Sequence, residues 1–356
     1  MKKYKRFYLN TKKIKNHTFR NKKKAKSKSK FNRHKKMYII KISLLVICFV
    51  CILTLIFKFA KIDLLFPQIF NHEQYIKDKK IIESLKVCIC TIGKWENRYI
   101  REYVQHYKKY GVDKIFLYDN NDINGEKFEE VINDYIKKGY VEVLNWRGKL
   151  TPQMEFLNDC YHKNSNNYDW LILYDLDEFI HLYNYTNIKL FLNQDKFKNC
   201  QEIFLNLVCH TDNNLLHYEN KPLYKRFPKT VPKNRIEGQL LSMKTIIRGH
   251  IKGVKIKSMH RGDYRLKTCN NRGVYEKLYG HSTYNSDQKY YYIDHYITKS
   301  TEEFIRKIKR GGVYNNATYY LIKRANSYFE INEITKEKEE ILEKAFGFKV
   351  KRATKR

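Results

Sequence analysis

The segment 170–180 (WLILYDLDEFI) carries Asp175, Asp177 and Glu178 directly after an apolar run. Such a run is typical of a buried parallel strand, and α/β proteins bind their ligands at the carboxyl edge of the sheet. Paired carboxylates at that edge favour a hard cation such as Mn²⁺ or Mg²⁺, which keeps coordination positions open for phosphate oxygens. The motif therefore predicts a metal site that also binds a diphosphate. The alternative interpretation is an acidic turn or helix start that binds no ligand.

The residues before this motif show the alternating pattern that a parallel sheet requires. Strand-like runs and amphipathic helical patterns alternate in the order 86–91, 95–110, 114–119, 128–136, 140–144 and 152–161. This alternation predicts a parallel α/β sheet with right-handed crossovers, an arrangement that often binds nucleotides. Asp119 ends the second strand, so we expect it at the same edge, where it accepts hydrogen bonds from a uracil or ribose. The alternative for Asp119 is an Asx turn.

The amino-terminal region differs in composition from the rest of the chain. Residues 1–36 contain seventeen Lys or Arg and no acid, which is half of the net charge of +34. Residues 42–57 contain no charged side chain, and with their apolar neighbours they predict a transmembrane helix over 38–60. The basic flank predicts that residues 1–37 are a cytoplasmic tail and that the body lies across the membrane, the type II signal-anchor arrangement. A buried soluble helix and a cleaved signal peptide are the alternatives, and no small-x-small cleavage site follows the apolar run.

The rest of the 356-residue chain divides by composition into a stem, one large domain and a tail. Mixed apolar and charged residues at 61–85 are typical of a short stem. The α/β domain is predicted over 86–312, and 313–356 is predicted to be a helical extension with a basic end. An S-x-x-E capping box near the end of the domain predicts a helix over Ser300–Lys309.

Several motifs occur in an order that resembles glycosyltransferase family 92 (DUF23) and related family 2-like glycosyltransferases. They are ENRYIRE (96–102), YDNND (118–122), DLDEF (175–179), DNNLLHY (212–218), KPLYKRF (221–227) and DHYITKSTEEF (294–304). The resemblance implies a GT-A fold, a UDP-sugar donor and a Mn²⁺ or Mg²⁺ cofactor. It also implies transfer of a hexose, most often galactose, with inversion at the anomeric carbon.

The resemblance assigns roles to residues of the metal motif. Asp175 and Asp177 match the family's Asp-x-Asp, in which the last Asp binds the metal and the first contacts the metal or the donor. Glu178 matches a family acid that either orients Asp177 or begins a helix. A third metal ligand in GT-A enzymes is often a histidine near the carboxyl end of the domain. His295 is therefore the expected ligand and His260 the alternative.

The same resemblance points to residues outside the metal motif. An inverting transferase needs a carboxylate base for the acceptor hydroxyl. Asp212, which follows a strand predicted at 202–208, is the expected base, and Glu237 is the reserve candidate. A turn Asp is the alternative for Asp212. Lys299 and Arg310 are expected to contact the diphosphate.

The expected partners are a nucleotide-sugar donor, a glycan, glycoprotein or glycolipid acceptor, and the membrane, but no nucleic acid. In a eukaryote the body would face the lumen of the endoplasmic reticulum or Golgi. A non-enzymatic alternative is a membrane-anchored protein whose basic arm binds anionic lipid or nucleic acid. A haloacid dehalogenase-like phosphatase is disfavoured, because that motif needs Thr or Ser where this chain has Phe179. Cys88 and Cys90 alternate on a strand and are not expected to pair with each other.

Overall fold

The computed structural model describes residues 41–50, 72–150, 153–231, 241–276, 278, 282–283, 290–311, 325 and 328–347. The chain divides into two units, residues 1–76 and 77–356. The predicted tail at 1–37 lies outside the described residues, as does all of the predicted span at 38–60 except the exposed helix at 41–50. Within the described ranges, no helix has the length and apolar character needed to cross a bilayer.

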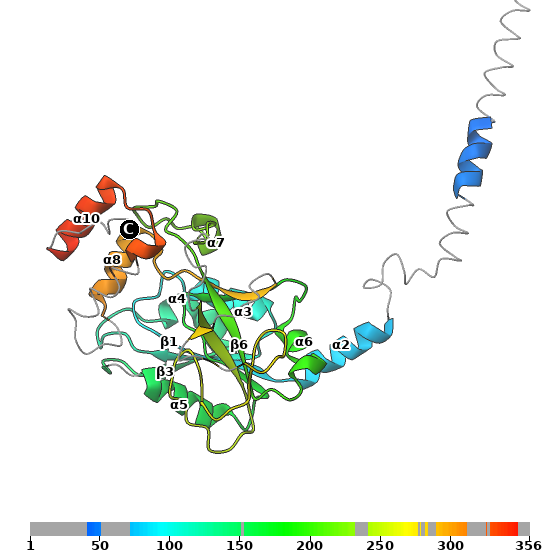
Figure 1. The fold of residues 1–356 in the computed structure, drawn as a ribbon, viewed down its shortest axis with the longest axis horizontal. Coiled ribbons are helices and arrows are strands. Elements are labelled where there is room, and N and C mark those ends of the chain that lie inside the picture. Colours follow the sequence, from blue (N-terminus) through cyan, green and yellow to red (C-terminus); the bar gives the residue numbers. More distant parts are fainter. Residues whose placement is uncertain are drawn as a thin grey trace, which may run out of the picture. The chain divides into compact units, whose positions relative to one another are not determined.

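The first half of the sheet is parallel, as the alternating pattern predicts (Figure 1). Its strands, in spatial order, are β3 (Val141–Asn145), β2 (Lys114–Asp119), β1 (Val87–Gly93) and β4 (Trp170–Ile172). β1 is almost wholly buried because helices cover both of its faces, which explains its nearly continuous apolar sequence. The register aligns Gly93 with Asp119, so the loops that follow these strands meet at one edge of the sheet.

The second half of the sheet is mixed, which the sequence did not predict. It continues with β7 (Leu241–Arg248), β6 (Glu202–Cys209), β10 (Tyr291–His295) and β5 (Glu178–Leu182). β7 is antiparallel to both β4 and β6, and β10 is parallel to β6 but antiparallel to β5. Only residues 173–177 connect β4 to β5, too few for the crossover that a parallel neighbour requires. β5 does not pair with β4; it pairs antiparallel with β10 and forms the edge of the sheet farthest from β3. Two short strands, β8 (Thr268–Cys269) and β9 (Ser282–Thr283), pair with β6 and β7.

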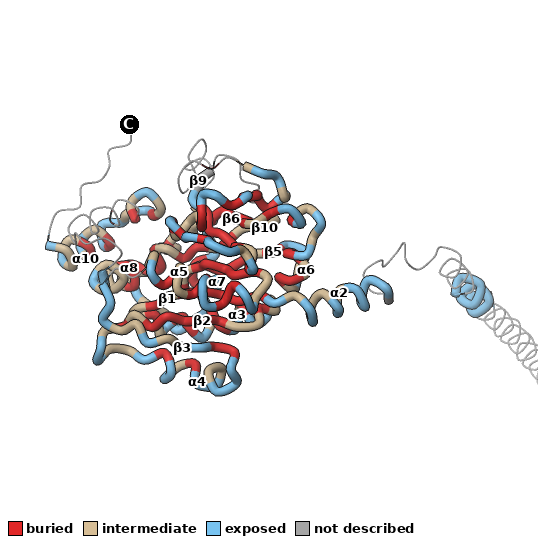
Figure 2. Tube along the Cα trace, turned by 90° about the horizontal axis from the view of Figure 1, so that it is seen from below, coloured by how far each residue is buried: buried red, intermediate tan, exposed pale blue. Residues whose placement is uncertain are grey.

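Helices pack on both faces of the sheet and enclose two hydrophobic cores. α3 (Ile100–Lys109) and α4 (Glu129–Lys137) contribute to the larger core, and α5 (Gln153–Asn164) contributes to the core on the other face. Figure 2 shows the buried residues concentrated in the strands between them. Gly111 and Gly139, both at positive φ, directly follow α3 and α4, where a left-handed residue ends a helix at least cost. Four further helices are α2 (His72–Ser84), α6 (Ile188–Leu192), the 3₁₀ helix η2 (Asp195–Phe197) and α7 (Leu223–Arg226).

The predicted capping box is confirmed at the start of α8 (Thr301–Lys309). The Ser300 side chain accepts a hydrogen bond from the Glu303 backbone N–H, and the Glu303 carboxylate accepts one from the Ser300 backbone N–H. α8 packs against α10 (Lys336–Phe346) through a small core that includes Phe304 and Leu342.

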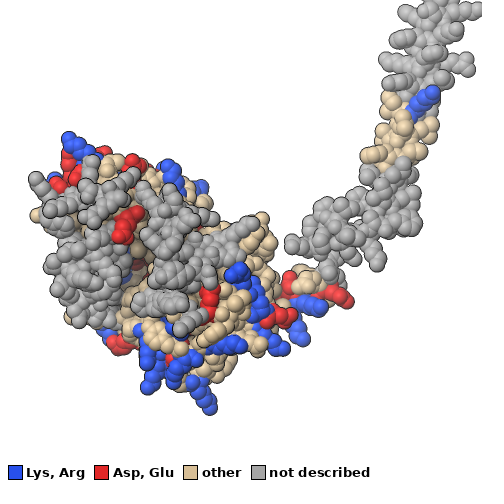
Figure 3. Space-filling view, viewed as in Figure 1, with Lys and Arg blue, Asp and Glu red and all other residues tan. Residues whose placement is uncertain are grey.

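Two disulfides tie distant segments together. Cys90 of β1 is bonded to Cys160 of α5, and Cys200 is bonded to Cys269 of β8. Cys88 is a buried free thiol, so the prediction that it does not pair with Cys90 is confirmed. The surface in Figure 3 carries charges of both signs, with lysine and arginine side chains gathered along the lower border of the body.

Candidate functional site

Two carboxylates and one imidazole meet at the point where β5 pairs with β10. Asp177 precedes β5, Glu178 is its first residue, and His295 is the last residue of β10. The antiparallel register places His295 opposite Glu178. One ligand atom from each of the three residues lies within 4.8 Å of the others, and all three residues are buried. His295 Nε2 is 3.7 Å from Asp177 Oδ1 and 4.0 Å from Glu178 Oε1.

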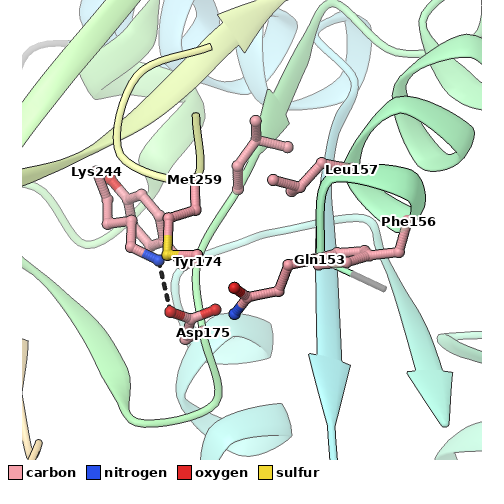
Figure 4. Close-up of a pocket in the computed structure, with 8 residues that line it drawn as sticks. Gln153, Phe156, Leu157, Tyr174, Asp175, Lys244 and Met259 are labelled. Atoms are coloured by element: carbon pink, nitrogen blue, oxygen red, sulfur yellow. Dashed lines mark hydrogen bonds and ion pairs between the residues drawn. The ribbon is translucent and has the colours of Figure 1, made fainter. Parts of the chain in front are cut away.

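Two lysines neutralise the acids of the motif. Lys244 of β7 places its Nζ 2.6 Å from Asp175 Oδ2 and 3.3 Å from Glu178 Oε1. Lys307 of α8 places its Nζ 2.6 Å from Asp177 Oδ2. Figure 4 shows the Lys244–Asp175 pair at the edge of a small pocket that Tyr174, Met259 and residues of α5 also line. Each aspartate of the Asp-x-Asp motif thus has its own ammonium group.

Burial and these neighbours set the protonation of the cluster. Desolvation raises the pKa of Glu178 to about 8, opposed by Lys244 and reinforced by the two nearby aspartates. Desolvation also acts to raise the pKa of Asp177, but the ammonium groups of Lys307 and Lys299 outweigh it, so the pKa lies well below its usual value. Desolvation lowers the pKa of His295 to about 3, which keeps the imidazole neutral. Asp177 is therefore ionised and His295 neutral, the states in which each binds a metal, whereas Glu178 must lose its proton before it can bind one.

The cluster fits a divalent cation. Glu178 Oε1 is a buried oxygen that faces the Asp177 and His295 side chains, and its nearest cation among the described residues is Lys244, with Nζ at 3.3 Å. Two carboxylate oxygens and one imidazole nitrogen form a donor set that Mn²⁺ accepts. The prediction named Asp175, Asp177 and His295 as the ligands; the structure brings Asp177 and His295 together with Glu178, while Asp175 pairs with Lys244. His260, the alternative ligand, lies outside this cluster and contacts the Met243 carbonyl through Nδ1 at 3.0 Å.

A cationic pocket lies next to the cluster and shares Lys307 with it. Its walls come from the residues that lead into α3 and from one face of α8. They are Trp95, Glu96, Tyr99, Lys299, Glu303, Arg306, Lys307 and Arg310. Four of these side chains are cationic and two are acidic. Of the acids, Glu303 is already neutralised by Arg226, which approaches its two carboxylate oxygens at 2.7 and 3.0 Å. Arg306 pairs with Glu126, but the cations of the pocket still outnumber the acids beside them, so the pocket keeps the excess positive charge that phosphate oxygens require.

Lys299 and Arg310, both predicted to contact a diphosphate, lie together in this pocket. Lys299 is buried with φ at +55°, and its Nζ is 3.8 Å from Glu96 Oε2 and 4.2 Å from the centre of the Tyr99 ring. Arg310 pairs with the other oxygen of Glu96. Lys307 and Arg306 were not among the predicted site residues, although their spacing of three and four residues from Glu303 and Arg310 places them on the same helix face.

Asp119 lies at the expected edge of the sheet, but both of its oxygens have partners within the chain. Oδ1 accepts hydrogen bonds from the backbone N–H and the side-chain amide of Asn121, which is the Asx turn weighed as the alternative. Oδ2 is 2.7 Å from the Arg147 guanidinium. A nucleoside contact by Asp119 stays a prediction.

Asp212 is buried, and its carboxylate contacts residues of the carboxyl-terminal segment. Oδ2 is 2.7 Å from Lys338 Nζ and accepts a hydrogen bond of 2.6 Å from the Tyr328 hydroxyl. Oδ1 accepts a hydrogen bond from the backbone N–H of Asn214. These contacts favour an anchoring function, and the role of Asp212 as a base stays a prediction. Glu237, the reserve candidate, lies outside the described residues.

The sequence matches one protein family over most of the body. A family model described as Glycosyltransferase family 92 matches residues 83–342. A family 92 protein of Oryza sativa subsp. japonica is 30% identical over 96 residues, which are 27% of this chain and 16% of the relative. One from Ricinus communis is 28% identical over 115 residues, which are 32% of this chain and 19% of the relative. The matched segments thus span less than a fifth of the length of these relatives.

Solved structures give a weaker likeness. The superposition on S. aureus TarS 1-349 in complex with UDP-GlcNAc covers 74% of this chain and 74% of the TarS chain, with 13% sequence identity and a TM-score of 0.33. The same TarS segment in complex with UDP covers 74% of this chain, also with a TM-score of 0.33.

Proposed function

Because this chain belongs to glycosyltransferase family 92, we propose that it transfers a hexose from a UDP-sugar to a hydroxyl group of a glycan acceptor. The reaction class is that of a metal-dependent hexosyltransferase with a GT-A fold. The observation that carries the proposal is that a candidate metal site and a cationic pocket lie next to each other. Asp177, Glu178 and His295 form a buried donor set for a divalent cation, and Lys307 joins that set to a pocket with excess positive charge.

The two features divide the work that cleavage of a sugar diphosphate demands. When the bond between sugar and diphosphate breaks, negative charge grows on the leaving phosphate. Asp177, Glu178 and His295 would hold a divalent cation, which would supply Lewis-acid stabilisation of that charge without proton transfer. Arg306 and Arg310, which line the pocket, supply fixed hydrogen-bond donors to the phosphate oxygens.

Inversion requires that the acceptor hydroxyl lose its proton to a base on the acceptor side. Asp212 is the candidate that the family resemblance offers for this step. Its contacts with Lys338 and Tyr328 would have to open before its carboxylate accepts a proton. A substitution of Asp212 separates an anchoring function from a catalytic one.

We also propose a type II membrane topology with the body in the lumen of the endoplasmic reticulum or Golgi. The basic residues before the apolar run at 42–57 support this orientation. The two disulfides of the body support it as well, since disulfides persist in oxidising compartments. Galactose is the donor sugar we would test first, and a glycoprotein or glycolipid glycan is the proposed acceptor.

The test is release of UDP by the full chain, offered a panel of UDP-sugars with Mn²⁺ or with a chelator. We expect turnover of one donor that depends on the metal and falls by about a hundredfold or more in Asp177→Ala. Glu130→Ala, which removes an exposed acid of α4, is the control and should retain activity. Equal turnover in chelator, or an Asp177→Ala variant as active as the parent, would contradict the proposal.

A further inference from the structure

Lys307 contacts both halves of the candidate site. Its Nζ donates hydrogen bonds to Asp177 Oδ2 at 2.6 Å and to the Ile297 carbonyl at 3.0 Å. Its side chain also lines the cationic pocket beside Arg306 and Arg310. No other residue among those described lines that pocket and also pairs with an acid of the proposed metal set.

The helix that carries Lys307 is held firmly in place. Glu303, one turn earlier on the same face, accepts hydrogen bonds from the buried Arg226 guanidinium, the Tyr99 hydroxyl and the Ser300 cap. The backbone of α8 is therefore fixed, and the part of Lys307 that is free to reorient is its flexible four-carbon side chain. Asp177 lies on one side of this flexible side chain and the cationic pocket on the other.

The charges around the Asp-x-Asp motif balance without a metal. Asp175 pairs with Lys244 and Asp177 pairs with Lys307, so two carboxylates face two ammonium groups. A dication that enters beside Asp177 adds two positive charges at a buried place and meets the Lys307 ammonium at close range. The arrangement is unfavourable unless the ammonium moves or an anion arrives, and a diphosphate carries the negative charge that the cations of the adjoining pocket attract.

We propose that Lys307 exchanges partners during binding: it neutralises Asp177 before the metal arrives, and it moves to a diphosphate oxygen when metal and nucleotide bind together. This inference rests on the proposed function, since it assumes that the cluster binds a divalent cation and that the pocket binds a nucleotide diphosphate. The exchange makes the binding of metal and nucleotide cooperative. The diphosphate draws the Lys307 ammonium away from the metal site, and the metal frees that ammonium from Asp177 so that it can bind the diphosphate. Lys307 is therefore a binding residue of the donor site as well as a competitor of the metal.

Lys244 does not share this function, although it makes a similar ion pair. Its side chain is 2% exposed, and its Nζ lies between Asp175 and Glu178. It is absent from the lining of the cationic pocket. The exchange is thus specific to the lysine on α8.

The experiment compares the full chain with Lys307→Met and with Lys309→Met, which removes an exposed lysine of the same helix. Mn²⁺ binding is measured by calorimetry without nucleotide, and UDP binding is measured with saturating Mn²⁺. Since an ion pair that competes with the metal is lost, we expect Lys307→Met to bind Mn²⁺ about tenfold more tightly. Since a charge-assisted hydrogen bond to phosphate is also lost, we expect it to bind UDP about tenfold more weakly. Lys309→Met should behave like the parent in both titrations.

Only the exchange of partners predicts that Lys307→Met binds Mn²⁺ more tightly and UDP more weakly than the parent. If the parent binds Mn²⁺ and UDP but Lys307→Met binds Mn²⁺ no more tightly, the exchange is wrong while the donor site stands. If neither protein binds Mn²⁺, both the exchange and the metal part of the proposed function fail. Should Lys307→Met not fold, as judged by its circular dichroism, Lys307→Gln keeps a polar side chain at this position. Lys307→Gln should then bind Mn²⁺ about tenfold more tightly than the parent, and an unchanged Mn²⁺ affinity would contradict the exchange.

Discussion

The carboxylate of Asp212 offers the sharpest choice between a catalytic and a structural function, and the substitution Asp212→Asn decides it. The Asp212 side chain is 2% exposed and its partner Lys338 is fully buried. The substitution leaves the Lys338 ammonium without its carboxylate, a change that typically costs about 3–5 kcal/mol. Lys338 keeps hydrogen bonds to Asn214 Oδ1 and to the Glu333 carbonyl, so we expect a loss of about 3 kcal/mol, at the lower end of that range.

A second variant tests whether the ion pair is the cause. In Asp212→Asn combined with Lys338→Met, no charge remains uncompensated, and the apolar side chain is close to lysine in volume. Replacing a buried pair in this way is often neutral, so we expect the double variant to recover at least about half of the lost stability. Both variants are compared with the parent by urea denaturation followed by circular dichroism, and UDP release is measured on the folded proteins.

The alternative function predicts a different pattern. A general base contributes about 10²–10⁴-fold to the rate, so its loss would reduce turnover by such a factor without a matching loss of stability. If Asp212→Asn unfolds within about 0.5 kcal/mol of the parent while turnover falls a hundredfold, our reasoning about the anchor is refuted and the base is supported.

Two further substitutions test the interior of the body. Glu303→Gln should lower stability by about 3–5 kcal/mol because it leaves the buried Arg226 guanidinium uncompensated; an unchanged midpoint in urea would contradict this. Burial lowers the pKa of His106 to about 4, whereas a histidine in the unfolded chain titrates at about 6.5. At this residue the unfolded state therefore binds more protons below pH 6.5, and His106 should lower the stability of the parent by about 1–2 kcal/mol between pH 7.5 and pH 5. Because His295 and Glu178 also titrate, the test is the difference in stability between the parent and His106→Gln, which keeps a donor near the Ile180 carbonyl; a difference that is the same at both pH values would refute the assignment.

The elements that the sequence predicted are those whose residues are set by local pattern. The strand at 114–119 was predicted with the bounds that β2 has, and the helices of the first half were predicted within a few residues because Gly111 and Gly139 mark their ends. The mixed second half was not predicted, because antiparallel pairing of β7 and β5 depends on contacts between strands far apart in the chain.

The site shows the same limit. The Asp-x-Asp motif pointed to Asp177, and the family resemblance pointed to His295, since both lie in recognisable local patterns. Lys307 and Lys244 were missed because a lysine among seventy-one basic residues carries no local signal. Their importance comes from positions 130 and 69 residues away from the aspartates they neutralise. Glu178 was noted but given no ligand role, because only the pairing of β5 with β10 turns it toward His295.

The position of the metal tests the central claim most directly. Crystals of the protein grown with Mn²⁺ and UDP would give an anomalous difference map at the manganese absorption edge. Our account predicts a single strong peak within bonding distance of Asp177, Glu178 and His295, with the diphosphate next to Arg306 and Arg310. A manganese ion bound elsewhere, with the Asp177–Lys307 pair still intact beside bound UDP, would contradict it.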